Sequence, residues 1–186
     1  MRIISGLLKG KSIKFLKNST TRPLKDAVRE NIFNILKHSN LIDVVVENAN
    51  ILDLYSGIGS FGLESISRGA KKVTFIERDK DAANILKENL IKLNVANKAN
   101  IINSNVEDVL KKNNSEKFDI FFLDPPFADK DFTQILNSIK RSKIYKIKHI
   151  LIIHRERKTE DNLGSSITTI LSKQYGRSKI IIGVFN

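Results

Sequence analysis

An acidic residue, two prolines and an aromatic residue follow an apolar run, at Asp124 to Phe127. The exocyclic amine of a nucleobase is a weak nucleophile, so an enzyme that alkylates it needs acceptors for both amino protons. Asp124 and the carbonyl of Pro125 can supply them, and Phe127 can stack on a flat base. Because proline fixes φ and lacks an amide donor, the loop is stiff. We therefore predict catalytic roles for Asp124, Pro125 and Phe127, although the segment also fits an ordinary strand ending in a turn.

A glycine-rich turn lies upstream, where the apolar run at 51–55 passes into residues 56–62. This pattern is typical of the first strand, turn and helix of a nucleotide-binding fold. A second short strand at 72–76 ends at Glu77, and a carboxylate in that place usually binds ribose hydroxyls. The glycine spacing alone fits an NAD enzyme as well as a methyltransferase.

Asp53 favours a methyltransferase, because it places a carboxylate inside a strand that is usually apolar throughout in dinucleotide-binding proteins. A carboxylate there suits a sulfonium-bearing amino acid better than a pyrophosphate, and glycines permit close approach of the backbone. Together with Gly57, Gly59, Glu77 and Asp124, Asp53 predicts S-adenosyl-L-methionine as the cofactor.

With these motifs the chain resembles the RsmD family of bacterial small-subunit ribosomal RNA guanine-N2 methyltransferases. Its opening stretch carries the same resemblance, in residues 1–6, 10–11, 21–23 and 28–34. The glycine turn is shared by many methyltransferases, the diproline loop is typical of amino-group methylation, and the opening stretch narrows the resemblance to this family. The resemblance implies methyl transfer to N2 of a guanine in 16S ribosomal RNA, within the assembled small subunit.

The resemblance also places the adenine edge of the cofactor after a third strand, at 99–103. We expect Asn105 to bind the adenine amine and Val106 to lie against the ring, with helix capping by Asn105 as the alternative. Family members tend to have a glutamate after the fifth strand, which has no clear match here, and His154 is expected to be a surface or substrate-facing residue. The residues predicted to bind the cofactor are Asp53, Tyr55, Gly57, Gly59, Glu77, Arg78, Asn105, Val106 and Asp124.

Positive charge is concentrated in two flanks of a chain whose net charge is +12. Residues 1–40 hold nine basic and two acidic side chains, and residues 140–158 hold eight and one. The segment 51–139 is near neutral, with 12 basic and 13 acidic side chains. This distribution predicts a surface for a polyanion around a small-molecule site. Part of the lysine excess also fits the codon bias of an AT-rich genome.

We expect residues 1–40 to form a small basic appendage that binds RNA. A short hairpin around Gly6 and Gly10 is predicted to precede a helix that begins at Asp26. The alternative is that this segment merely covers the sheet. The residues expected to contact RNA are Arg2, Lys11, Arg22, Lys25 and Arg29.

A length of 186 residues with 41% hydrophobic content predicts one substantial core, with residues 41–186 as the methyltransferase domain. Alternating strands and helices predict an α/β, Rossmann-like class I S-adenosylmethionine-dependent methyltransferase, with a mainly parallel seven-stranded sheet and an antiparallel C-terminal hairpin. The predicted strands are 51–55, 72–76, 99–103, 118–123, 149–153, 167–173 and 179–185.

Composition narrows the chemistry further. The chain has no cysteine and only three histidines, so we expect no metal site and no cysteine adduct of the kind that C5 methylation of pyrimidines requires. Without an 18-residue apolar run or a signal sequence, a soluble, cytoplasmic protein is expected. We also expect it to be a monomer. The alternatives are an amino methyltransferase acting on adenine or DNA, an inert RNA-binding assembly factor, and an NAD dehydrogenase.

Overall fold

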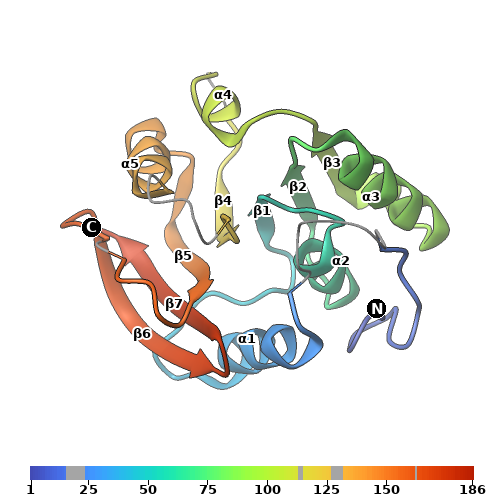
Figure 1. The fold of residues 1–186 in the computed structure, drawn as a ribbon, viewed down its shortest axis with the longest axis horizontal. Helices are drawn as coiled ribbons and strands as arrows, with labels where there is room; N and C mark the ends of the chain where they lie inside the picture. The colour runs from blue at the N-terminus through green and yellow to red at the C-terminus, as the bar shows by residue number, and fades with distance from the viewer. Residues whose placement is uncertain (16–23, 113–114, 127–131, 162) are drawn as a thin grey trace.

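The computed structural model describes residues 1–15, 24–112, 115–126, 132–161 and 163–186. At its centre is a seven-stranded sheet in the order β3-β2-β1-β4-β5-β7-β6 (Figure 1). The strands are β1 (Asn50–Leu54), β2 (Lys72–Ile76), β3 (Ala99–Ile102), β4 (Phe118–Leu123), β5 (Tyr145–Glu156), β6 (Ile167–Tyr175) and β7 (Ser178–Phe185). Strands β1 to β5 pair in parallel, and β7 runs antiparallel between β5 and β6. This confirms the predicted sheet with its antiparallel C-terminal hairpin.

Helices cover both faces of the sheet (Figure 1). One face carries α1 (Asp26–His38), α2 (Ser60–Ser67) and α3 (Lys80–Lys92), and the other carries α4 (Val106–Leu110) and α5 (Phe132–Ser142). A 3-10 turn, η1 (Ala96–Lys98), precedes β3. Neighbouring residues of a strand point to opposite faces, so Ile51 packs in the α1–α3 layer and Leu52 in the α4–α5 layer. No helix in the described ranges is both long and apolar enough to cross a membrane.

The opening segment lies against α2 (Figure 1) and doubles back in a short antiparallel pairing, as predicted. Arg2 and Ser12 form its one bridge, and the amides of Ile3 and Ile13 donate to the carbonyls of Lys11 and Met1. The pairing does not extend beyond Ile3. The amides of Ile4 and Ser5 donate to the two carboxylate oxygens of Glu64 on α2, at 2.8 and 3.0 Å, and so are not available to a partner strand. The segment is therefore fastened to the helix that follows the glycine-rich turn.

Leu7 and Phe15 are exposed, but seven other apolar side chains in the described part of residues 1–40 belong to the core of the sheet. They pack in the same cluster as Ile51 of β1 and Phe61 of α2. Those that are buried are Ile3, Ile13, Leu24, Val28, Ile32, Phe33 and Leu36.

Arg29 on α1 is buried completely, so the prediction that it is free to contact phosphate is wrong. Its Nη2 donates to the carbonyl of Arg2 at 2.7 Å and to Asp26 Oδ1 at 3.1 Å, and its Nε lies 3.8 Å from the buried carboxylate of Glu64. Burial lowers the pKa of Arg29, while the charges of Asp26 and Glu64 raise it. Arg29 joins α1, α2 and the opening segment inside the protein.

The carboxyl ends of β1, β2 and β4 meet at one edge of the sheet. In the register of the sheet, Leu54 lies beside both Ile76 of β2 and Leu123 of β4. The strand order reverses between β1 and β4, and in open α/β sheets ligands bind outside the carboxyl ends at such a switch point. The loops after these three strands are therefore the place to examine for a site.

Candidate functional site

The turn after β1 has left-handed backbone at three positions: Tyr55 with φ of 61°, Gly57 with 54° and Gly59 with 83°. At Gly59 a Cβ atom would lie 2.4 Å from Cδ1 of the buried Leu86, so packing as well as conformation requires glycine. A Cβ atom on Gly57 would meet no atom within 4 Å. The backbone of Gly57 is thus bare on the side that a ligand at this edge would approach.

Glu77, after β2, is in direct contact with the glycine-rich turn. The amide of Gly57 donates to its Oε2 at 2.6 Å, and the amide of Asp79 donates to its Oε1 at 2.8 Å. The two carboxylate oxygens thus tie the turn after β1 to the beginning of α3. Gly57 and Glu77 were both predicted to bind the cofactor, but their contact with each other was not. Arg78, beside Glu77, is exposed.

Asp53 is a buried carboxylate, 1% exposed, next to the last residue of β1. Its Oδ2 accepts from the amide of Gly62 at 3.0 Å, while Oδ1 has no hydrogen-bond partner among the described residues. Burial raises the pKa of Asp53 well above its ordinary value, the Gly62 amide lowers it, and the charges of Asp124 and Glu77 raise it further. The negative charges of two further carboxylates therefore act on Asp53 at this edge, which favours a ligand that carries positive charge.

Asn105 is exposed at the position before α4, and its side chain forms no capping hydrogen bond. Capping was the alternative to contact with adenine, and the structure does not show it. Val106 is buried in the first turn of α4. Contact of these two residues with adenine stays a prediction.

Asp124, directly after β4, is paired with His154 of β5. The Nδ1 atom of His154 lies 2.7 Å from Oδ1 of Asp124, and its Nε2 lies 2.9 Å from Oγ of Ser178 on β7. His154 is only 6% exposed, so the expectation of a surface residue is wrong, while a substrate-facing position stays a prediction. The contact follows from the register, in which Leu123 pairs with Ile153 and the next residues of the two strands stand opposite each other.

Arg155 holds the diproline loop and is 2% exposed. Its Nη1 donates to the carbonyl of Pro126 at 3.0 Å, its Nε donates to Asp161 at 2.8 Å, and its guanidinium lies 4.5 Å from the ring centre of Phe132. Lys179 of β7 forms a second ion pair with Asp161, at 2.9 Å. Although burial raises the pKa of Asp161, hydrogen bonds from Lys179 and Arg155 lower it below its ordinary value. Asp161 therefore stays ionised and fixes the guanidinium.

The structure brings Asp53, Gly57, Glu77 and Asp124 to one edge of the sheet, as their places after strands indicated. Of the predicted RNA contacts, Arg2, Lys11 and Lys25 are exposed. Two predicted residues, Phe127 and Arg22, lie outside the described residues. The sequence interpretation missed His154 and Arg155, whose only signal was two polar residues at the end of an apolar strand.

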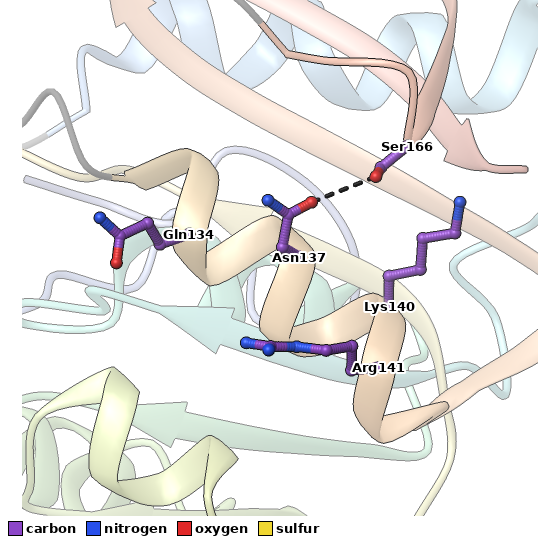
Figure 2. A pocket seen from close by; sticks show the side chains of 5 residues that line it. All are labelled: Gln134, Asn137, Lys140, Arg141 and Ser166. Atoms are coloured by element: carbon purple, nitrogen blue, oxygen red, sulfur yellow. Dashed lines mark hydrogen bonds between the residues drawn. The ribbon is translucent and has the colours of Figure 1, made fainter.

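A groove of about 430 Å³ lies along α5, away from these strand ends (Figure 2). In it the Oγ of Ser166 donates to Oδ1 of Asn137 at 3.1 Å. Its charged lining residues are both basic and belong to the basic flank at 140–158. The lining residues are Gln134, Asn137, Lys140, Arg141 and Ser166.

Comparison with known sequences gives one family and several relatives. A sequence model of the family described as "Conserved hypothetical protein 95" matches residues 1–184. The "Ribosomal RNA small subunit methyltransferase D" of Haemophilus influenzae is 43% identical over 129 residues, which are 68% of this chain and 64% of that protein. The "Putative rRNA methyltransferase YlbH" of Bacillus subtilis is 30% identical over 186 residues, 98% of this chain and 97% of that protein.

Solved structures share the whole architecture. The "Putative methyltransferase yhhF" of Escherichia coli superposes with a TM-score of 0.84 at 26% identity, over 98% of this chain and 96% of that one. An RNA methyltransferase from Salinibacter ruber, solved with S-adenosyl-L-homocysteine, has a TM-score of 0.65 at 12% identity, over 87% of this chain and 92% of that one. At 12% identity, the similarity to the Salinibacter ruber protein is evidence for the fold only. Together they confirm the predicted class I methyltransferase fold.

Proposed function

Because this chain belongs to the conserved hypothetical protein 95 family of RsmD- and YlbH-type methyltransferases, we propose that it methylates the exocyclic N2 of a guanine in small-subunit (16S) ribosomal RNA. The methyl donor is S-adenosyl-L-methionine. The observation that carries the proposal is the position of the Asp124 loop, next to the glycine-rich turn and the buried carboxylate of Asp53. An acceptor for amino protons thus stands beside a site suited to a cationic cofactor.

The residues at the strand ends fit this cofactor. Asp53 has a buried oxygen with no partner among the described residues, and Gly57 leaves open space in front of its backbone. S-adenosyl-L-methionine bound there supplies a methyl group on a sulfonium, which an amine attacks directly. We assign its amino-acid end to Asp53, Tyr55 and the glycine-rich turn. We assign binding of the ribose to Glu77 and Arg78, and binding of the adenine to Asn105 and Val106.

In the proposed reaction Asp124 and the carbonyl of Pro125 accept hydrogen bonds from the two amino protons of the guanine. Holding both protons directs the nitrogen lone pair towards the methyl group, and most of the acceleration comes from positioning. Phe127 is assigned to stack on a base extruded from single-stranded or loop RNA. Pro125 and Pro126 keep the acceptors stiff, and Arg155 fixes the Pro126 carbonyl from inside the protein.

The RNA backbone is assigned to the basic flanks, with residues 1–40 as the RNA-binding part and residues 41–186 as the methyltransferase part. Arg2, Lys11 and Lys25 are exposed on the first flank, and Arg22 remains a predicted contact there. On the second flank, Lys140 and Arg141 line the α5 groove, where they can contact phosphate (Figure 2). Arg29 is excluded from this surface by its burial. We expect a monomer to act on the assembled small subunit.

The test is methyl transfer from labelled S-adenosyl-L-methionine to small ribosomal subunits that lack the modification, followed by digestion to nucleosides. Labelled N2-methylguanosine at one site is expected. Label in adenosine would support an adenine methyltransferase, and no label in subunits or naked RNA would support an inert assembly factor. Naked RNA tested in parallel shows whether assembly is required.

Asp124→Ala should abolish turnover at the same site while cofactor affinity is kept, because the residue is assigned to the substrate amine. The matched control is Asp119→Ala at the other end of β4, where the carboxylate accepts from the Asn50 amide and from Lys146. Full activity of the Asp124 variant would contradict the catalytic assignment. Equal losses in both variants would point to damage to β4 instead.

A further inference from the structure

His154 stands opposite Asp124 across neighbouring parallel strands, with Nδ1 2.7 Å from Oδ1 of the carboxylate. Both residues are well enclosed, with side-chain exposures of 8% for His154 and 22% for Asp124. The second ring nitrogen, Nε2, lies 2.9 Å from the hydroxyl of Ser178. The imidazole therefore bridges the predicted catalytic loop and β7.

The hydrogen-bond partners of the His154 ring show which of its nitrogens carries a proton. An ionised carboxylate only accepts hydrogen bonds, so Nδ1 carries a proton and donates it to Asp124. In the neutral ring Nε2 then accepts from the hydroxyl of Ser178, which can donate. Because both nitrogens are engaged by protein groups, His154 is placed to hold Asp124 in one orientation.

The same loop is held from the other face of the sheet. Arg155, the next residue of β5, donates to the carbonyl of Pro126, and its guanidinium is fixed by Asp161. Successive residues of a strand point to opposite faces, so His154 and Arg155 fasten the loop from two sides. Arg155 fixes a backbone carbonyl, whereas His154 contacts the reactive carboxylate itself.

We propose that His154 is a positioning residue, which sets the orientation of the Asp124 carboxylate through a hydrogen bond from Nδ1 and so readies it for the substrate amine. This rests on the proposed methyl transfer, in which Asp124 accepts an amino proton. Oδ1 of Asp124 accepts the hydrogen bond from the imidazole. The carboxylate is partly exposed, so its other oxygen is left to accept a hydrogen bond from the substrate amine. Removing the donor frees the carboxylate to rotate without removing the acceptor.

A first test needs no enzymatic activity. The chain has three histidines, so the ring signals of a nitrogen-15-labelled protein can be assigned by single substitutions. A protonated Nδ1 is expected for His154 in the cofactor-free protein, and its proton signal should shift upfield or be lost in Asp124→Ala. A ring signal of His154 that Asp124→Ala leaves unchanged would overturn the pairing.

His149 of β5 is the internal reference for this measurement. Its Nδ1 lies 2.8 Å from the carbonyl of Lys146, and its Nε2 accepts from the amide of Phe185 at 3.0 Å, so its ring has the same tautomer with partners unrelated to Asp124. Its signals should not move in Asp124→Ala. Movement of both rings would mean a general rearrangement and would count against the specific pairing.

A second test uses kinetics. His154→Ala should lower kcat about tenfold or more, since misplacing a catalytic group is costly, while the Kd for S-adenosyl-L-methionine changes less than about twofold. In His154→Asn the side-chain amide can still donate to Asp124, so most of the lost activity should return. Wild-type kcat in His154→Ala, or no difference between the alanine and asparagine variants, would overturn the proposal. His149→Asn, made on the same strand, reports the cost of altering a buried histidine away from the site.

The two proposals fail in different ways. If the wild-type protein transfers no methyl group to RNA, the proposed function fails, while the ring signals still decide whether His154 donates to Asp124. If the wild type is active and His154→Ala is equally active, only the positioning role fails. Thermal unfolding of each variant shows whether it is folded at the assay temperature, and His154→Asn supplies the comparison if the alanine variant is not.

Discussion

Asp53 is a residue whose environment opposes its own ionisation. Burial and the neighbouring charges of Asp124 and Glu77 raise its pKa well above the ordinary value, and one of its oxygens has no partner among the described residues. A buried acceptor without a partner typically costs about 1–3 kcal/mol of stability. A cationic ligand beside it would remove much of that cost. The residue is thus unfavourable for the cofactor-free fold and suited to the proposed cofactor.

Asp53→Asn should therefore stabilise the cofactor-free protein at pH 8. Because the folded pKa of Asp53 is raised, the wild type has its full stability below the unfolded pKa and loses stability as pH rises through the folded pKa. Asparagine does not ionise, so at pH 8 its Tm should exceed that of the wild type by about 2–4 °C, the shift that 1 kcal/mol produces at this size. Thermal scans should show the gap closing below about pH 4, and cofactor affinity should fall. A wild type as stable as the variant at pH 8 would contradict this account.

The sequence allowed the types and places of the site residues to be predicted, but not all of their partners. Asp53, Glu77 and Asp124 could be located because each lies in or directly after an apolar strand. The pairing of His154 with Asp124 depends on the register of β4 and β5, which no local pattern records. Arg29 was misassigned because a polar residue on a helix is usually exposed, and its partner Glu64 lies 35 positions away in the chain.

At the scale of elements, two of the three glycines at the junction of β1 and α2, Gly57 and Gly62, are required for different structural reasons. Gly57 has positive φ and open space where a Cβ would point. Gly62, inside α2, has no such space, since a Cβ there would lie 2.2 Å from the ring of the buried Phe75. One glycine serves the approach to the sheet edge, and the other serves the packing of α2 on β2.

Substituting each glycine by alanine should separate these roles. Gly62→Ala should lower the free energy of unfolding by about 1–3 kcal/mol, as overpacking of a core does. Gly57→Ala should cost about 1 kcal/mol for left-handed backbone but weaken cofactor binding more, because its methyl group enters the space proposed for the ligand. Denaturant unfolding and calorimetric titration with S-adenosyl-L-methionine measure the two effects. Unchanged cofactor affinity in Gly57→Ala would argue against a ligand at this turn.

The attachment of the diproline loop to β5 should depend on Arg155, which donates to the carbonyl of Pro126. Arg155→Met removes one partner of a buried ion pair, so we expect a loss of about 3 kcal/mol or more in the free energy of unfolding, together with reduced methyl transfer. Arg177→Met is the matched control, because Arg177 pairs with Glu156 at the surface and should contribute less than about 1 kcal/mol. Similar losses of unfolding free energy in both variants, measured by urea unfolding, would show that the buried ion pair of Arg155 contributes no more than the surface pair of Arg177.

Most elements could be placed from apolar runs alone. The runs at 72–76 and 118–123 coincide with β2 and β4, because strands buried on both faces are continuous apolar segments bounded by polar residues. The predicted fifth strand, 149–153, is shorter than β5, which runs from Tyr145 to Glu156. The segments of β5 on either side of the apolar run contain lysine, histidine and arginine, and so they did not read as strand. The opening hairpin is limited to one bridge because the amides of Ile4 and Ser5 bond to Glu64, a long-range contact with no local signal.

At the scale of the whole molecule, charge and chemistry occupy different parts of the chain. The segment 51–139 supplies the strand ends and is near neutral, whereas the flanks at 1–40 and 140–158 hold most of the excess positive charge. Sequence-independent contacts to phosphate release counterions and make binding depend on salt. The proposed RNA affinity should therefore fall steeply with salt, while cofactor affinity should not.

Replacing Lys11 and Lys25 together by glutamine should weaken RNA binding and flatten its salt dependence. Each lost phosphate contact should reduce the slope of log K against log salt by about one. Filter binding to small-subunit RNA between about 50 and 200 mM salt measures the slope. Lys87→Gln, on the exposed side of α3, is the control and should leave the slope unchanged. An unaltered slope in the double variant would remove these two residues from the RNA contact.

The insertion of β7 between β5 and β6 sets the order in which the molecule can be completed during synthesis. β7 is the last of the seven strands to leave the ribosome, yet it supplies Ser178 to His154 and Lys179 to Asp161. A nascent chain that ends before β7 already has the strands of the cofactor edge and both residues that contact the diproline loop, His154 and Arg155, but it lacks the β7 partners of His154 and Asp161. Full support of the two residues that hold the proposed catalytic loop thus waits until β7 has been synthesised and has inserted between β5 and β6.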